Sequence, residues 1–336
     1  MNIVYLIGNG FDLSLDLPTA YSDFYNYYLD QPNRDPEIEN LKNSIETDRV
    51  NWSDLEEALG KYTINLHTKE ALIRLHKDLI NNLRTYLEKI EADCNCDDSQ
   101  NELISRYLIY PETILPYTDQ QGIQTFKSKW SGHDWQIKII TFNYTTILEK
   151  LISYIGQQKR IGNTNYNRTV ILKEIQHIHG SITKGMALGL NDPSQFLNET
   201  YREDRLLKNK YIKQKLNVVA RTGHDDLCQV AIKGANLICV FGLSFGITDL
   251  RWWQYIGDRI MQRDILLILF YHNDKINLND LDEAELYEEE DRVRNLFLTM
   301  TSLSDTDKEQ VREKIFVSIN SSMFKIDNEI LKRVKT

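Results

Sequence analysis

Short apolar runs alternate with helical patterns along most of the chain. The first run covers residues 3–7 and breaks at Gly8-Asn9-Gly10. Further β-rich runs lie at 136–142, 175–179, 236–241, 264–271 and 314–318, and helical patterns follow at 146–156, 247–262 and 283–301. Strands that alternate with helices predict an α/β fold with a mainly parallel sheet that is covered on both faces. In such sheets ligands bind at the carboxyl ends of the strands.

The long stretch after the first run has helical periodicity instead. The helices predicted there span 21–29, 36–46, 53–62, 69–91, 101–110 and 123–130. Ser53, with Glu56 three residues later, has the pattern of a capping box. A strand–helix–strand crossover needs only a few tens of residues, so we expect a helical insertion over about 25–130. The prediction is one α/β domain, 1–336, with strand 3–7 central and an insertion that covers the carboxyl edge of the sheet.

Polar residues and glycines follow four of the predicted strands, and a parallel sheet would bring them to one edge. The candidate site residues are Gly8, Asn9, Gly10, Phe11, Asp12, Asn143, Thr145, His179, Gly180, Gly242, Ser244 and Asp249. The first turn suits a phosphate, because its glycines let a ligand approach backbone N–H groups. Leu13 occupies the position of the third glycine in the dinucleotide fingerprint, which disfavours a hydride-transfer enzyme.

Charge and cysteine content restrict the partners and the compartment. A net charge of −9 makes a nucleic-acid partner unfavourable, since such binders need a basic face. The lysines within 208–215 are predicted to lie on a solvated helix face. The opening apolar run is too short for a signal sequence or a membrane span. Four cysteines without metal-ligand spacing fit a reducing compartment, so we expect a cytoplasmic protein with no membrane partner and no metal.

The motifs taken together resemble a known family. The chain begins with IGNGFDL, LPT and Y-x-DF, continues with a tryptophan–acidic segment from Trp52 to Glu56, and later contains FNYTTILE, HIHGSI, GLND and GLSFGITD. This order and approximate spacing resemble the bacteriophage abortive-infection AbiH family, although Asp16 stands where the family usually has glycine. The resemblance implies an antiphage abortive-infection effector. It leaves open a phage-derived trigger and assembly into a homo-oligomer.

The same order more remotely resembles the sirtuin-like NAD-binding superfamily, which implies a Rossmann-like sheet. By position, Asn143 matches the polar asparagine of that superfamily and His179 matches its catalytic histidine. Thr145 stands where sirtuins have an aspartate, and the chain has no cysteine ribbon, so protein deacylation is not expected. The resemblance implies NAD, or a related nucleotide, as ligand or substrate.

Cleavage of the bond between nicotinamide and ribose suits the residue types at this edge. Its transition state resembles an oxocarbenium ion, as in glycoside hydrolysis, and the leaving group needs no proton. The Asn143 amide can donate and accept at once, and His179 can act as a base near neutral pH. His177 is predicted to support His179 from the same strand face. The first turn would hold the pyrophosphate and Ser244 the adenosine ribose.

Three functions follow as alternatives. The first is an NAD glycohydrolase that depletes the nucleotide, with Asn143 and His179 as catalytic residues. The second is a catalytically inert nucleotide-binding sensor, which Thr145 in place of the aspartate favours. The third is a nucleic-acid-processing defence effector, which the acidic charge disfavours. Asn143 would be a turn residue, and His179 a structural one, if the edge had no catalytic function.

Overall fold

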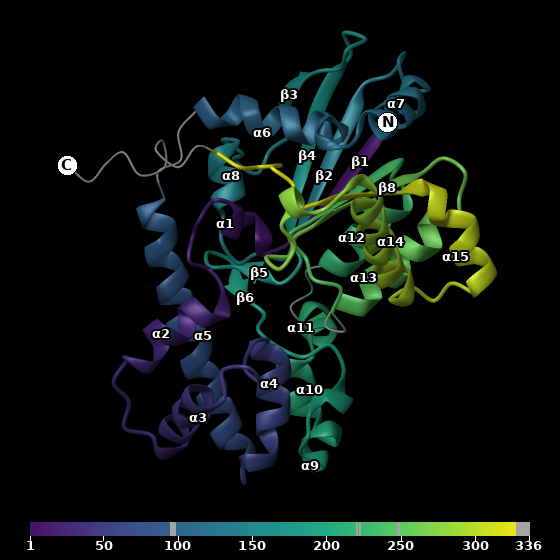
Figure 1. Cartoon of the computed structure of the whole chain (residues 1–336). Coiled ribbons are helices and arrows are strands. Elements are labelled where there is room, and N and C mark those ends of the chain that lie inside the picture. Colours follow the sequence, from purple (N-terminus) through teal and green to yellow (C-terminus); the bar gives the residue numbers. More distant parts are fainter. Residues whose placement is uncertain (95–98, 220, 222, 247–248, 327–336) are drawn as a thin grey trace.

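The computed structural model describes residues 1–94, 99–219, 221, 223–246 and 249–326 (Figure 1). Within them a seven-stranded sheet has the order β3-β4-β2-β1-β7-β8-β9, and a two-stranded hairpin, β5-β6, lies apart from it. All neighbouring strands of the large sheet pair in parallel except β3, which is antiparallel to β4. The strands are β1 (Asn2–Ile7), β2 (Trp135–Thr141), β3 (Lys159–Asn163), β4 (Thr169–His177), β5 (Gly180–Ser181), β6 (Gly185–Met186), β7 (Leu237–Phe241), β8 (Leu266–Tyr271) and β9 (Ile315–Ile319). The predicted α/β fold with a mainly parallel sheet and a central first strand is confirmed.

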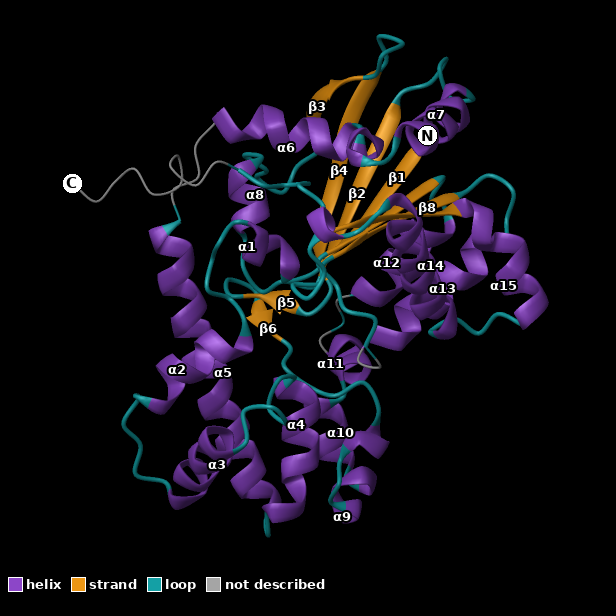
Figure 2. Ribbon diagram, in the orientation of Figure 1, coloured by secondary structure: helices purple, strands orange, loops and turns teal. Residues whose placement is uncertain are grey.

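Helices cover both faces of the sheet because its strands are apolar on both sides (Figure 2). In β1, Ile3 and Tyr5 face one layer of core, and Val4 and Leu6 face the other, as the two-residue period of a strand requires. The first layer contains α1 (Gly10–Ser14), α6 (Ser99–Ile109), α7 (Tyr117–Ser128) and α8 (Ile147–Leu151). The second contains α12 (His224–Lys233), α13 (Leu250–Ile260), α14 (Glu283–Thr299) and α15 (Asp305–Val311).

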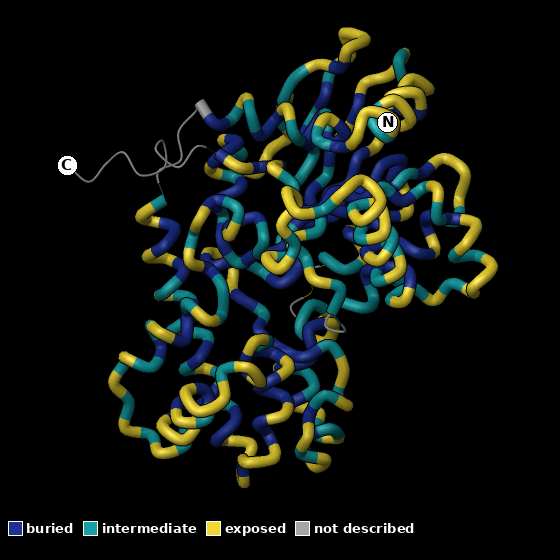
Figure 3. Tube along the Cα trace, viewed as in Figure 1, coloured by how far each residue is buried: buried dark blue, intermediate teal, exposed yellow. Residues whose placement is uncertain are grey.

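A third core lies beyond the carboxyl ends of the strands, in the lower half of Figure 3. It is built from α2 (Tyr21–Leu29), α3 (Pro36–Thr47), α4 (Leu55–Tyr62), α5 (Lys69–Asp93), α9 (Glu199–Glu203) and α10 (Arg205–Tyr211), with α11 (Lys213–Val219) beside it. We call this third core the helical cap.

The short 3-10 helices of the described residues are η1 (Thr63–Asn65), η2 (Pro111–Ile114), η3 (Pro193–Gln195), η5 (Leu278–Asp280) and η6 (Arg312–Lys314).

The predicted cap differs from the observed one in two respects. Helices α6 and α7 fall within 25–130, yet they pack against a face of the sheet and not over its edge, because Ile104, Leu108 and Ile123 meet the strand side chains there. The loop 182–196 and helices α9 and α10 instead complete the cap from a later part of the chain. An apolar helix face alone does not reveal which apolar layer it will join.

Several predicted boundaries were wrong. Strand β4 ends at His177, so residues 178 and 179 form a turn, and α8 is shorter than the predicted 146–156. Helix α13 begins at Leu250, and positions 247 and 248 of the predicted helix lie outside the described residues. The cap of α4 is Asp54, whose carboxylate accepts from the backbone N–H groups of Glu56 and Glu57, and so Ser53 is not the N-cap. In the described part of the chain, no helix combines the length and apolar character that a membrane crossing needs.

Candidate functional site

Backbone hydrogen bonds join the loops that follow β1, β2, β4 and β7 at the carboxyl edge. The amide of Phe142 donates to the carbonyl oxygen of Ile7 over 2.8 Å, and the amide of Ile178 donates to Thr141 over 3.0 Å. Parallel pairing in the order β4-β2-β1-β7 places these loops side by side. The edge therefore brings together most of the side chains that the sequence singled out.

The first turn is occupied by its own neighbours. The amide of Gly8 donates to Phe241 and that of Gly10 to Gly242, both over 2.9 Å, and the amide of Phe11 donates to Gly8. A Cβ on Gly10 would lie 2.4 Å from the Cα of Gly242, which has a left-handed φ of 68°. Close approach of two loops therefore accounts for these glycines. Because each of those three N–H groups already has a carbonyl acceptor, the turn is poorly suited to the predicted phosphate.

Two residues of the predicted nucleotide set, Asn9 and Phe11, are held by contacts within the protein. The Asn9 side chain exchanges hydrogen bonds with Thr19, donating to its carbonyl oxygen over 3.0 Å and accepting from its hydroxyl over 2.8 Å. Phe11 is fully buried and packs edge-on against Phe324, with ring centroids 5.3 Å apart. Asn9 therefore fixes the loop that leads to α2, and Phe11 belongs to the core and not to a ligand site.

A cavity of about 110 Å³, which we call the inner cavity, contains a buried carboxylate. The Asp12 carboxylate accepts from the Asn143 amide over 3.1 Å and from the Thr145 hydroxyl over 2.7 Å. Burial raises the pKa of Asp12 to about 7, although the hydrogen bonds from Thr145 and Asn143 oppose the shift. Phe142 and Tyr144 also line this cavity. Asp12 is therefore an acid that can gain or lose a proton near neutral pH.

His177 supports Asn143 and not His179. Its Nδ1 lies 2.9 Å from the Asn143 carbonyl oxygen, and its Nε2 lies 2.5 Å from Glu149 Oε1. Burial alone would lower the pKa of His177, but the hydrogen bond and the charge of Glu149 outweigh it and raise the pKa. The expected shared strand face of His177 and His179 was wrong, because the strand has already ended at His177.

A second cavity of about 260 Å³, the outer cavity, contains His179. Burial, and next the charge of Lys213, hold the pKa of His179 well below its usual value, so the ring is neutral at neutral pH. Its Nε2 lies 4.0 Å from Asp249 Oδ1. Phe142 packs edge-on against His179, with centroids 5.5 Å apart, so the two cavities adjoin at this pair of rings.

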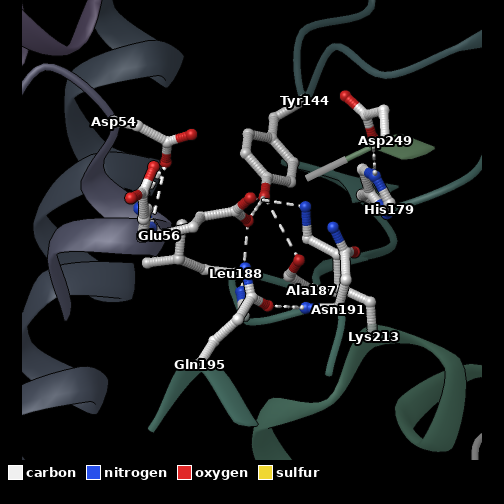
Figure 4. A network of polar contacts seen from close by, with 12 residues as sticks. Asp54, Glu56, Tyr144, His179, Ala187, Leu188, Asn191, Gln195, Lys213 and Asp249 are labelled. Atoms are coloured by element: carbon white, nitrogen blue, oxygen red, sulfur yellow. Dashed lines mark hydrogen bonds and ion pairs between the residues drawn. The ribbon is translucent and has the colours of Figure 1, made fainter. Parts of the chain in front are cut away.

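A buried ion pair ties the outer cavity to the helical cap (Figure 4). Lys213 Nζ lies 2.5 Å from Glu56 Oε2, and the amide of Gly189 donates to Glu56 Oε1 over 3.1 Å. Burial alone would lower the pKa of Lys213, but the carboxylates of Glu56 and Asp249 raise it. The expected solvated face was therefore wrong for Lys213. Sequence reasoning also missed the role of Glu56, and its only signal was the acidic segment after Trp52.

The remaining predicted residues are placed less favourably. Gly180 has a φ of 73° and its Cβ would lie 1.7 Å from the Gly185 carbonyl oxygen, so the β5-β6 hairpin requires glycine there. Ser244 is exposed and is not among the residues that line the inner or the outer cavity. Asp249 does line the outer cavity. Asn9, Asp12, Asn143 and Thr145 thus line the inner cavity, and His179 and Asp249 line the outer one.

The sequence model of one protein family, bacteriophage abortive infection AbiH, matches residues 4–271. This match spans β1 to β8 and includes every residue that lines the two cavities. The chain belongs to the AbiH family. Membership indicates a role in phage abortive infection. No curated protein matches the chain.

The AbiH segments recognised in the sequence contribute separately to the two cavities. IGNGFDL supplies Asp12, FNYTTILE supplies Asn143 and Thr145, and HIHGSI supplies His179. The tryptophan–acidic segment and GLND meet at the hydrogen bond between Glu56 and the amide of Gly189. AbiH segments that are far apart in the sequence therefore lie together at one edge of the sheet.

Proposed function

We propose that this AbiH protein binds NAD or a related nucleotide at the carboxyl edge, in the cytoplasm, and hydrolyses the bond between its base and ribose. Loss of the nucleotide would then halt the infected cell. The proposal assigns the nucleotide binding that the resemblance to sirtuin-like, Rossmann-like proteins implies to the carboxyl edge of the sheet.

One observation carries the proposal. Asn143 Oδ1 and both ring nitrogens of His179 are buried, and none of them has a hydrogen-bond partner within the described residues. A buried polar atom without a partner costs about 1–3 kcal/mol, so a fold retains it where a ligand supplies the bond. The hydroxyls of a ribose can donate to Asn143 Oδ1, and they can donate to or accept from a neutral imidazole.

Asp12 is better suited than His179 to move the proton. A general base works best when its pKa lies near the operating pH, and burial brings the pKa of Asp12 to about 7. His179, with its lowered pKa, would instead orient the ribose or the water. Thr145 replaces the aspartate of sirtuins, and the Asp12 carboxylate accepts from its hydroxyl over 2.7 Å. A carboxylate is thus available at that position from another part of the chain.

The reaction would balance with water as the only co-reactant. Positive charge grows on the ribose as the bond to the base breaks, and the electron pair of that bond leaves with the nicotinamide. Asp12 would stabilise this charge and take a proton from the water whose oxygen forms the new bond to the ribose. Asn143 and Thr145 hold the carboxylate in position throughout.

Nicotinamide release from NAD by the purified protein tests the function. Asp12→Asn keeps the shape of the side chain and removes the base, so release should fall by about 10²–10⁴-fold. Asp258→Asn, which neutralises an exposed carboxylate on α13, is the matched control and should keep wild-type activity. Absence of release by the wild-type protein would refute hydrolysis. If calorimetry still detected NAD binding, the sensor function would take its place.

A further inference from the structure

We infer that the outer cavity holds a cationic ring, the pyridinium end of an oxidised nicotinamide nucleotide, and that Asp249 selects it over the uncharged reduced form. This assignment rests on the proposed function and names the part of the ligand that each charge recognises. It reverses the usual expectation that a lysine in a nucleotide site binds phosphate.

Both cations of the outer cavity already have carboxylate partners. Lys213 lies 2.5 Å from Glu56, and Arg251 Nη1 lies 2.7 Å from Asp225 Oδ2. The Arg251 guanidinium also stacks over the Trp252 ring, 5.5 Å from its centroid. A phosphate in this cavity would have to break one of these pairs, and it would face the remaining carboxylates at short range.

Asp249 differs from the other two carboxylates of the cavity, because Asp225 is paired with Arg251, and Asp192 is exposed and accepts from the backbone amide of Ser194. Among the described residues, its one ionic contact within 4 Å is that with His179 Nε2, at 4.0 Å, and that ring is neutral. Burial raises the pKa of Asp249, although the charge of Lys213 opposes the shift. A cation bound beside Asp249 would favour its ionised form. The carboxylate is therefore a partner for positive charge that no described side chain neutralises at hydrogen-bond distance.

The rest of the lining suits a flat, polar ring. Trp252 lines the cavity, and Phe142 packs edge-on against both Trp252 and His179. Amide side chains complete the wall, namely Asn191, Gln195, Gln214, Asn217 and Gln254. Aromatic rings favour a cation over their faces, and amides can both donate to and accept from a carboxamide.

The test uses nicotinamide riboside, which has the cationic ring and no phosphate, and its reduced dihydro form, which has no charge on the ring. Calorimetry with the full chain at pH 8 should show at least about tenfold tighter binding of the oxidised form. Asp249→Asn should reduce this preference to about threefold or less, and Asp258→Asn should leave it unchanged. Inorganic pyrophosphate should not compete with the riboside.

Equal binding of the two ribosides by the wild-type protein would overturn the assignment, and so would competition by pyrophosphate. Neither result depends on a variant that must fold. The outcome is also separable from that of the proposed function. If the riboside binds with the expected charge preference but NAD releases no nicotinamide, hydrolysis fails and the assignment stands. If NAD is hydrolysed but Asp249→Asn retains the full preference, the assignment fails and hydrolysis stands.

Discussion

The buried carboxylate of Asp12 makes the folded protein lose stability as the pH rises. Its pKa is about 7 in the folded state and about 3.9 in an unfolded chain. The folded state therefore binds the proton more tightly. The stabilisation that the proton on Asp12 gives to the folded state is complete below the unfolded pKa. It declines as the pH rises toward 7 and is lost above pH 7. Linkage between these two pKa values predicts that Asp12 lowers the free energy of unfolding by about 3 kcal/mol between pH 5 and pH 8.

Asp12→Asn removes this dependence without a change of shape. The introduced amide can accept from Asn143 through its oxygen and donate to the Thr145 hydroxyl through its nitrogen. Urea unfolding at pH 5 and pH 8 should therefore show a smaller loss of stability in the variant than in the wild type, by about 3 kcal/mol. Asp258→Asn should retain the wild-type loss. If Asp12→Asn also retained it, the carboxylate would not titrate near neutral pH and could not be the base.

Four further variants test neighbouring parts of the edge. Alanine at His179 or at Asn143 should lower nicotinamide release by about 10²-fold, because the ribose or the water loses its orientation, and should reduce phage protection in cells; normal release by both would rule out their role. Gly10→Val should lower the free energy of unfolding by about 3 kcal/mol, because its Cβ meets backbone at 2.4 Å; Gly122→Val, in open space, is the control, and equal urea midpoints would contradict the clash. Lys213→Met should destabilise by about 3–5 kcal/mol, since its partner carboxylate on α4 stays buried. Urea midpoints equal to wild type would show that the pair contributes little.

Local patterns were sufficient for most of the sheet and insufficient for its edges. Strands β1 and β7 are apolar on both sides, so their runs were visible in the sequence. Strand β3 was missed because it lies at an edge of the sheet and its sequence, KRIGN, contains a single large apolar residue and a glycine, all of them half-buried or exposed. Its antiparallel pairing with β4 follows from a tight turn at 164–168 and not from any apolar run.

The sequence could group the residues of the candidate site only to the extent that the order of the strands in the sheet could be predicted. Knowing that the loops after parallel strands share an edge was enough to group Asp12, Asn143 and His179. It could not show that β7 lies beside β1, and this adjacency is what commits the amides of Gly8 and Gly10 to carbonyl acceptors. The glycine pair therefore indicated a phosphate turn in the sequence and a close contact of two loops in the structure.

Burial explains why the residues best suited to chemistry were undervalued or missed. Asp12 and Asp249 were the two carboxylates among the candidate site residues, and nothing in the sequence separates one from the other. In the structure, Asp12 has two donors and a pKa of about 7, whereas Asp249 faces a neutral ring and a paired lysine. The two acids thus differ in the charge they can best oppose, and this difference arises from partners on α4, α11 and the loop after β2, each distant from them in the chain. The spacing of motifs along the sequence can locate such an edge. Only the contacts across the edge distinguish Asp12, the proposed proton acceptor, from Asp249, the proposed partner of a cationic ring.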